Sequence, residues 1–115
     1  MATIKSYSDL QQSKKLVEIL PLESADMYYE DDISVEFGHG WHPQHIPCWS
    51  LAALLELITK VQQDGVLFNL TYDFILNKWT MTIEADNWKN DVGLYDNPVD
   101  ACVAMIEKLN ELKML

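Results

Sequence analysis

The chain has 115 residues, 49% of them hydrophobic, and a formal net charge of −10 at pH 7. This length fits a single domain, residues 1–115, with enough apolar material to form a core without metals or disulfides. All eight basic residues are lysine, and 18 residues are acidic. Direct nucleic-acid binding and adsorption to an anionic membrane are therefore disfavoured, because both depend on Lys and Arg facing negative charge.

The first residues contain no apolar signal-peptide segment, and no apolar run approaches the ~20 residues needed to span a membrane. Cys48 and Cys102 lie in apolar stretches without a CxxC spacing. Both are expected to be reduced core residues in a cytoplasmic protein, where disulfides are rare.

The first predicted element is a helix over residues 8–20. Ser8 and Gln11 have capping-box spacing, and Pro21 ends the helix because its ring cannot continue it. A second helix is predicted from Trp49 to Gln62, with a polar strip so narrow that the helix is expected to be the buried centre of the fold.

Between these helices, alternating apolar and polar residues predict a β-hairpin over 25–37. A three-residue loop, Glu30-Asp31-Asp32, keeps one face wholly apolar and is preferred for that reason. This register gives the pairs Ala25–Phe37, Met27–Val35 and Tyr29–Ile33. It also places two like charges, Asp26 and Glu36, opposite each other.

A second hairpin is predicted around the two-residue turn Asn77-Lys78. Its apolar face pairs Leu76 with Trp79, Phe74 with Met81 and Tyr72 with Ile83. The inward aromatic residues of the two hairpins are expected in the core: Tyr29, Phe37, Tyr72, Phe74 and Trp79.

A third helix is predicted to begin after Asn97, a favourable N-cap, with Pro98 at its first position. The resulting fold class is α+β in the order α-ββ-α-ββ-α, with two antiparallel hairpins packed on a largely buried central helix. The hairpins form either one four-stranded sheet or two separate ribbons, and the sequence leaves both arrangements open.

Three segments carry a resemblance: IPCWSLAALL at residues 46–55, NPVDACVAMI at 97–106 and LPLESADM at 20–27. They are similar to segments of small uncharacterised proteins from bacterial phages, prophages and mobile elements. That group has no assigned activity, so the resemblance implies no site residues. It implies a bacterial cytoplasmic setting and an accessory phage role.

One candidate metal site is the loop 39–48, in which His39, His42 and His45 recur at every third residue and Cys48 follows. Imidazole and thiolate are ligands that zinc prefers. The spacing matches no established zinc motif, however, and the loop contains Gly and Pro. We expect an ordinary structural loop without a cofactor, and no nucleophile or phosphate-binding motif is present elsewhere.

The acidic residues are concentrated between Lys15 and Lys60, where no basic residue occurs. Exposed aromatic side chains bordered by acids suit a protein interface. The candidate protein-binding residues are Glu30, Asp31, Asp32, Glu36 and Trp41.

The sequence therefore favours a non-enzymatic acidic adaptor or inhibitor that binds a protein partner. Charge complementarity suggests that this partner is basic. A DNA mimic is the sharper form of this hypothesis. The alternative is a metal-binding protein or metal-dependent enzyme that uses the histidine loop 39–48.

Overall fold

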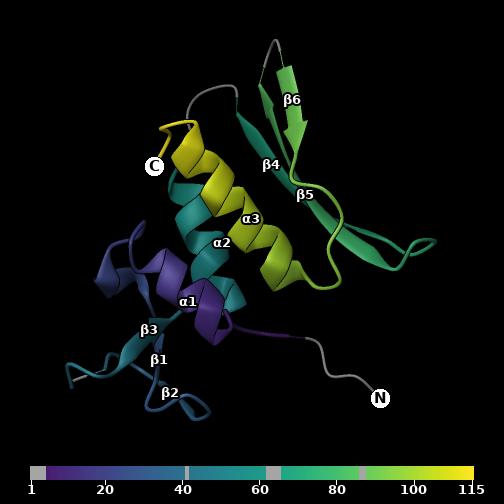
Figure 1. Cartoon of the computed structure of the whole chain (residues 1–115). Coiled ribbons are helices and arrows are strands. Elements are labelled where there is room, and N and C mark those ends of the chain that lie inside the picture. Colours follow the sequence, from purple (N-terminus) through teal and green to yellow (C-terminus); the bar gives the residue numbers. More distant parts are fainter. Residues whose placement is uncertain (1–4, 41, 62–65, 86–87) are drawn as a thin grey trace.

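A computed structural model of the chain describes residues 5–40, 42–61, 66–85 and 88–115. These ranges form an α+β fold with two three-stranded antiparallel sheets, as Figure 1 shows. The helices are α1 (Leu10–Leu16), the 3-10 turn η1 (Leu22–Ser24), α2 (Leu51–Lys60) and α3 (Pro98–Glu111). The strands are β1 (Met27–Tyr29), β2 (Val35–Phe37), β3 (Ile46–Cys48), β4 (Leu67–Asp73), β5 (Lys78–Ala85) and β6 (Trp88–Asp91).

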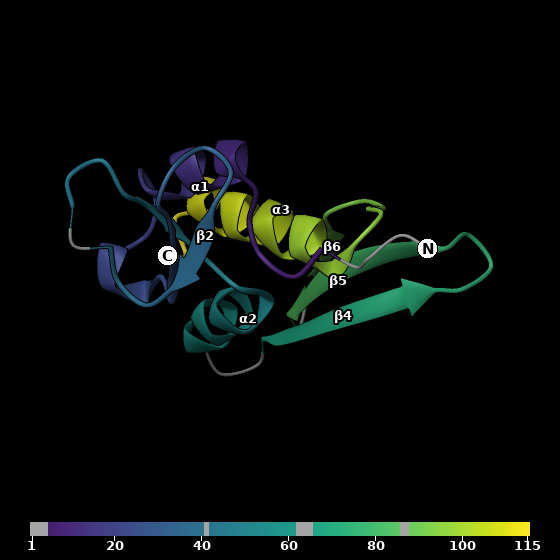
Figure 2. The same ribbon diagram turned by 90° about the horizontal axis from the view of Figure 1, so that it is seen from below.

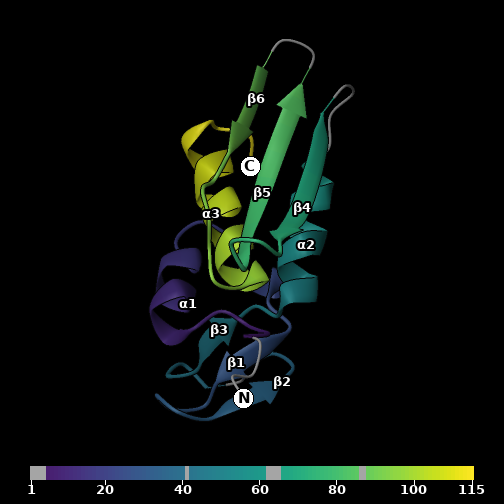
Figure 3. The same cartoon turned by 90° about the vertical axis from the view of Figure 1, so that its right-hand side faces the viewer.

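The main core forms around α3, which packs against α2 on one side and against β5 on another. The sheet β4-β5-β6 covers the two helices with one face, and Figure 3 shows its other face turned toward the viewer. Met81 and Ile83 of β5 are buried against the helices, as are Leu54 and Ile58 of α2. Burial of these aliphatic side chains is the main favourable term in folding.

The prediction that α2 is the largely buried centre of the fold is not confirmed. Only three of its ten residues are buried, Ala53, Leu54 and Ile58. In α3, eight of fourteen residues are buried. The reason is that α2 packs mainly against α3, whereas α3 packs against both α2 and β5.

The small sheet, in the order β2-β1-β3, has a separate apolar cluster beneath it. Met27, Tyr29 and Cys48 form this cluster, and Leu10 of α1 packs against it. The two hairpins therefore belong to two separate sheets, and only the second one packs against the main core.

The register predicted for the first hairpin is wrong by two residues. Met27 pairs with Phe37 and Tyr29 with Val35, so the loop is Asp31-Asp32-Ile33. The Asp31 carboxylate accepts hydrogen bonds from the backbone N–H groups of the loop, which favours this turn over the alternative that the apolar pattern suggested. The predicted pair of Asp26 and Glu36 is absent, because Glu36 lies opposite Tyr28.

The second hairpin is shifted by four residues from its predicted register, since Asp73 pairs with Lys78 and Tyr72 with Trp79. Asp73 Oδ1 accepts the N–H groups of Ile75 and Leu76 at 3.0 and 3.1 Å. Asn77 adopts a left-handed conformation with φ of 54°. These local interactions close a four-residue turn, and Phe74 is exposed rather than buried in the core.

Two strands were not predicted, β3 and β6. Pro47 lies in β3, where proline normally opposes strand formation. It is tolerated because β3 is an edge strand and Pro47 lies opposite Tyr28 at a position that needs no N–H toward β1.

The helix termini follow simple capping chemistry. Asn97 caps α3 by accepting the N–H of Asp100, and Pro98 begins the helix, as predicted. The capping box of α1 consists of Asp9 and Gln12, one residue later than predicted, and the helix ends at Leu16. Ser50 caps α2, so this helix begins two residues after the predicted start at Trp49.

No helix in the described part of the chain is long and apolar enough to cross a membrane.

The dominance of α3 in the core is testable with matched substitutions. We expect Leu109→Ala in α3 to lower the free energy of unfolding by about 3 kcal/mol, because a buried leucine leaves a cavity. Leu55→Ala in α2 should cost only about 1 kcal/mol, since that side chain is half-buried. Urea denaturation followed by circular dichroism measures both values; equal losses would contradict this assignment of the core.

Candidate functional site

The end of the molecule formed by β1, β2 and their loop carries a cluster of carboxylates. Glu30, Asp31 and Asp32 lie at the loop, and Glu36 lies on β2; all four are exposed. We call this surface, together with Ile33 and Phe37, the acidic end. Trp41, the fifth predicted binding residue, lies outside the described residues.

Two large apolar side chains lie among these carboxylates. Ile33 is 89% exposed and Phe37 is 82% exposed, so the prediction that Phe37 belongs to the core is wrong. The cause is that β2 is a short edge strand with no element covering Phe37. Exposed aromatic and aliphatic groups of this size, bordered by polar residues, are typical of interaction surfaces.

A groove of about 390 Å³ adjoins Phe37. It lies between the N-terminal segment and the small sheet, and its lining consists of Ser6, Tyr7, Met27, Val35, Phe37 and Ser50. Phe37 belongs to both the groove and the acidic end, so the apolar groove and the acidic end meet at β2.

The loop of the acidic end has a defined backbone conformation. Asp31 Oδ1 accepts the N–H groups of Ile33 and Ser34, each at 2.7 Å. These backbone hydrogen bonds lower the pKa of Asp31 below its usual value. The carboxylate therefore stays ionised at neutral pH while it orders the turn.

The carboxylates of the acidic end differ in their ion pairing from the other acidic residues that the structure describes. Within the described ranges, no ion pair involves Glu30, Asp31, Asp32 or Glu36. Each ion pair found elsewhere joins a lysine to an acid outside this surface, such as Lys60 with Glu56. The negative potential of the acidic end is therefore available to a cationic partner.

The edge of β2 also offers backbone groups. Glu30 N–H donates to Ser34 O, and Gly38 N–H donates to Asp26 O. Because hydrogen-bonded pairs alternate along an antiparallel ladder, the N–H and C=O groups of Val35 and Phe37 point away from β1. An extended segment can pair with them.

The histidine loop has a different arrangement from a metal site. His42 Nδ1 accepts the N–H of Gln44 at 3.1 Å, and His45 Nδ1 accepts the N–H of His42 at 3.3 Å. The His45 ring also stacks on Tyr28 with centroids 4.7 Å apart. Among the described residues, no three His, Cys, Asp or Glu side chains are grouped in a way that could hold a metal ion.

A cavity of about 440 Å³ lies under this loop. The side chains of His39, His42, His45, Glu23 and Tyr28 line it together with apolar groups such as Leu22. Gly40 packs so closely on His45 that a Cβ there would lie 2.5 Å from the His45 Cβ. The loop is thus brought together by ring packing and backbone hydrogen bonds.

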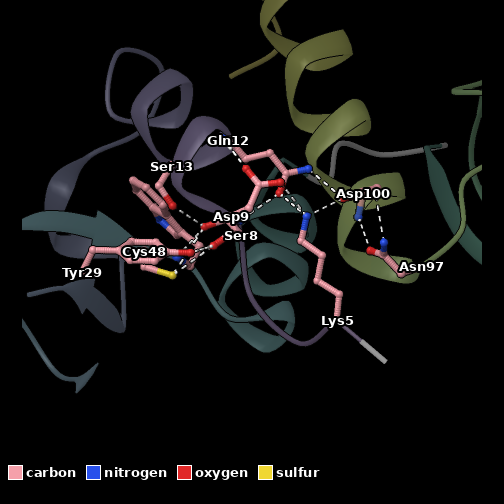
Figure 4. A network of polar contacts seen from close by, with 10 residues as sticks. Lys5, Ser8, Asp9, Gln12, Ser13, Tyr29, Cys48, Asn97 and Asp100 are labelled. Carbon is pink, nitrogen blue, oxygen red and sulfur yellow. Dashed lines mark hydrogen bonds and ion pairs between the residues drawn. The ribbon is translucent and has the colours of Figure 1, made fainter. Parts of the chain in front are cut away.

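Cys48 lies in a buried cluster around Ser8 (Figure 4). Its thiol donates to Ser8 O at 3.4 Å, and the Tyr29 hydroxyl donates to the same oxygen at 2.9 Å. Burial raises the pKa of Cys48. Burial is also the largest cause of the rise in the pKa of Tyr29 to about 12. Cys48 is therefore held as a thiol at neutral pH.

Figure 4 also shows a second polar network, which was not predicted from the sequence. Lys5 Nζ contacts Asp9 Oδ2 at 2.9 Å, Gln12 Oε1 at 2.8 Å and Asp100 Oδ1 at 2.8 Å. Gln12 Nε2 donates to Asp100 Oδ1 at 2.7 Å. The network ties the N-terminal segment to the first turns of α1 and α3. No local sequence pattern indicates it, because Lys5 precedes α1 and Asp100 lies 95 positions away along the chain.

The same contacts shift the pKa values in the network. Burial alone would raise the pKa of Asp100, but hydrogen bonds from Lys5 and Gln12 outweigh it and the pKa is lowered. Burial likewise opposes the charged form of Lys5, and the hydrogen bonds to Asp100 and Asp9 raise its pKa in spite of it.

Comparisons of the chain with protein-family models, with curated proteins and with solved structures find no match. The similarity to phage and prophage proteins stays a prediction for this reason. The features that bear on function are then those of the chain itself: the acidic end, the histidine loop and the two polar clusters.

The Lys5 network gives a testable prediction of stability. We expect Lys5→Met to lower the free energy of unfolding at pH 7 by roughly 1 kcal/mol, because it leaves the Asp100 carboxylate without its cation. The matched variant Lys60→Met, which removes an exposed pair with Glu56, should have almost no effect.

The loss caused by Lys5→Met should depend on pH. The lowered pKa of Asp100 contributes stability above its usual value of 3.8, and this contribution is lost as the pH falls through the folded-state pKa. The raised pKa of Lys5 contributes stability below pH 10.5, and this contribution is lost as the pH rises through the folded-state pKa. Urea denaturation from pH 3 to pH 11 measures the difference between variant and wild type; a difference that does not shrink at either extreme would contradict the network.

Proposed function

We propose that the protein is a non-enzymatic binding module, an adaptor or inhibitor, whose acidic end binds a basic, partly apolar segment of a partner protein. The observation that carries this proposal is the exposure of Phe37 and Ile33 among four carboxylates that form no ion pair with any described lysine. An interface of this kind places apolar groups at its centre and charges at its rim.

Charge complementarity defines the partner. A segment with Lys or Arg side chains meets the carboxylates of Glu30, Asp32 and Glu36, which all lie in the stretch of the chain without a basic residue. Such complementarity raises the association rate and selects against acidic partners.

The apolar groups supply affinity that exposed ion pairs alone do not. The groove of about 390 Å³ beside Phe37 receives an apolar side chain, with Tyr7 and Val35 as its walls. The outward backbone groups of Val35 and Phe37 pair with an extended chain. Lys or Arg alternating with apolar residues is the pattern that fits all three features.

The apolar side chains favour binding of a protein segment over the alternative that the chain is a DNA mimic, which would occupy the DNA-binding site of an enzyme. A mimic needs carboxylates in a row that matches the phosphates of a DNA strand, which follow one another every ~3.4 Å along the helix axis. Here Ile33 and Phe37 interrupt the carboxylates, and one of them, Asp31, is engaged with its own backbone.

Affinity capture from a bacterial lysate, with quantification of each retained protein, tests the proposal. We expect a basic protein to be retained at about 0.05 M salt and largely lost at about 0.5 M, since screening weakens exposed charge pairs. Phe37→Ser, and separately the triple variant Glu30→Gln, Asp32→Asn, Glu36→Gln, should each reduce its retention at least about tenfold.

Phe74→Ser is the matched control, because Phe74 is also exposed but lies on the β4–β5 hairpin. It should retain the same partner as the wild type. The proposal is wrong if the retained proteins do not differ between wild type and Phe37→Ser, or if Phe74→Ser reduces retention equally.

A further inference from the structure

The edge of β4 differs from the other sheet edges in the described part of the chain. β2 and β3 have three residues each, and they carry Glu36 and Pro47; β6 has four residues and carries Lys89 and Asp91. β4 has seven residues, with neither charge nor proline from Leu67 to Tyr72. Short length, charge and proline are the features that protect edge strands from pairing, and β4 has only the charge of Asp73 at its last residue.

The backbone of β4 is oriented for pairing. Trp79 exchanges two hydrogen bonds of 2.7 Å with Tyr95, so its N–H and C=O point away from β4. Tyr72, which lies opposite Trp79, therefore directs its own N–H and C=O away from β5. By the same alternation Leu70 and Phe68 do so too, and Figure 3 shows no strand on that side of β4.

The turn that follows β4 is apolar and projects beyond the helices, as Figure 2 shows for the end of the β4–β5 hairpin. Phe74 is 76% exposed and Ile75 is 81% exposed, with Leu76 beside them. At the opposite end of β4, Leu67 is 61% exposed. Apolar side chains thus mark both ends of the strand.

The turn is ordered rather than loose. The Asp73 carboxylate accepts hydrogen bonds from two backbone N–H groups of the turn, and the Tyr72 hydroxyl donates to Asn77 Oδ1 at 2.8 Å. An ordered apolar surface binds at a lower entropic cost than a flexible one.

Lysines lie near the carboxylates of β4 and β5, in contrast to the described residues of the acidic end. Lys78, which lies opposite Asp73, pairs with Asp96, and Glu84, which lies opposite Leu67, pairs with Lys89 at 3.3 Å. Two copies of this edge therefore approach each other with little local repulsion, although each whole chain carries a charge of −10.

We propose that β4 pairs antiparallel with β4 of a second copy of this chain, about a two-fold axis at Leu70, to form one continuous sheet with three strands from each copy. This register pairs all seven residues and places Phe68 of each copy opposite Tyr72 of the other. It uses the outward backbone groups of Phe68, Leu70 and Tyr72 and keeps the helices of both copies on one side of the sheet.

The register also accounts for the exposed apolar side chains. Antiparallel pairing brings the Phe74–Leu76 turn of each copy to the end of the other strand where Leu67 lies, and it does so twice because of the two-fold axis. Each tip covers apolar surface on the other copy. A heterologous partner strand would satisfy the same edge but not this reciprocal placement.

The experiment is sedimentation equilibrium of the full chain from about 5 to 500 µM. We expect the average mass to rise with concentration from 13.3 kDa toward twice that value. Raising the salt from about 0.05 to 0.5 M should strengthen association several-fold, because it screens the net charge of the two copies. Salt weakens the proposed partner binding at the acidic end, so the two surfaces respond in opposite directions.

Matched variants locate the interface. Thr71→Lys places a guarding charge on the exposed edge and should weaken association at least about tenfold. Thr80→Lys makes the same change on the same sheet face, at the residue paired with Thr71 on the central strand, and should leave association within about twofold of wild type. Phe74→Ser should weaken association, whereas Phe37→Ser should not.

Amide hydrogen exchange of the wild-type chain gives a readout that requires no variant. The amides of Phe68, Leu70 and Tyr72 should exchange more slowly at high than at low protein concentration, while those of Asn69 and Thr71, which face β5, should not change.

A mass of 13.3 kDa at every concentration and salt overturns the proposal. So does equal weakening by Thr71→Lys and Thr80→Lys, an average mass beyond that of a dimer, or outward β4 amides whose exchange is independent of concentration. Loss of the dimer would leave the partner binding at the acidic end unaffected, and the reverse also holds.

Discussion

The enclosure of α3 between α2 and the sheet β4-β5-β6 is the constraint on which the rest of the structure depends. Val99, Cys102, Ile106 and Leu109 are fully buried, so this helix must be covered along most of its length. The sheet supplies that cover with one face only. A strand pair as long as β4 and β5 extends past the buried helix, and the turn beyond its end has nothing to pack against.

The same constraint divides the surface into two regions of opposite character. The carboxylates gather at the small sheet, which lies apart from α3, while uncharged residues and carboxylates with lysines near them occupy the edge beside the main core. A cationic segment suits the first region and a second copy suits the other. Under the two proposals, one chain of this size makes two independent contacts, one with a partner protein and one with a second copy.

Part of this fold could be predicted from the sequence, because capping and alternation are local signals. The Asn97-Pro98 cap was predicted correctly, and both hairpins exist. Their registers could not be predicted, since Asp31 and Asp73 each bind two turn amides and this local bonding outweighed the apolar pattern. Both shifts were by an even number of residues, so Met81 still faces the core. The acidity of the site was evident, but the exposure of Phe37 follows from the position of β2 at an edge, which is a property of the tertiary structure.

The separate apolar cluster of the small sheet has a consequence for dynamics. Met27, Tyr29 and Cys48 pack among themselves and α1, and the hydrogen bonds of Ser8 to Trp49 connect them to the larger core. We expect such a unit to open at a lower free energy than global unfolding requires. A ligand held there would suppress this sub-global opening first, and would slow proteolytic nicking of that end before it changed the thermal midpoint of the whole molecule.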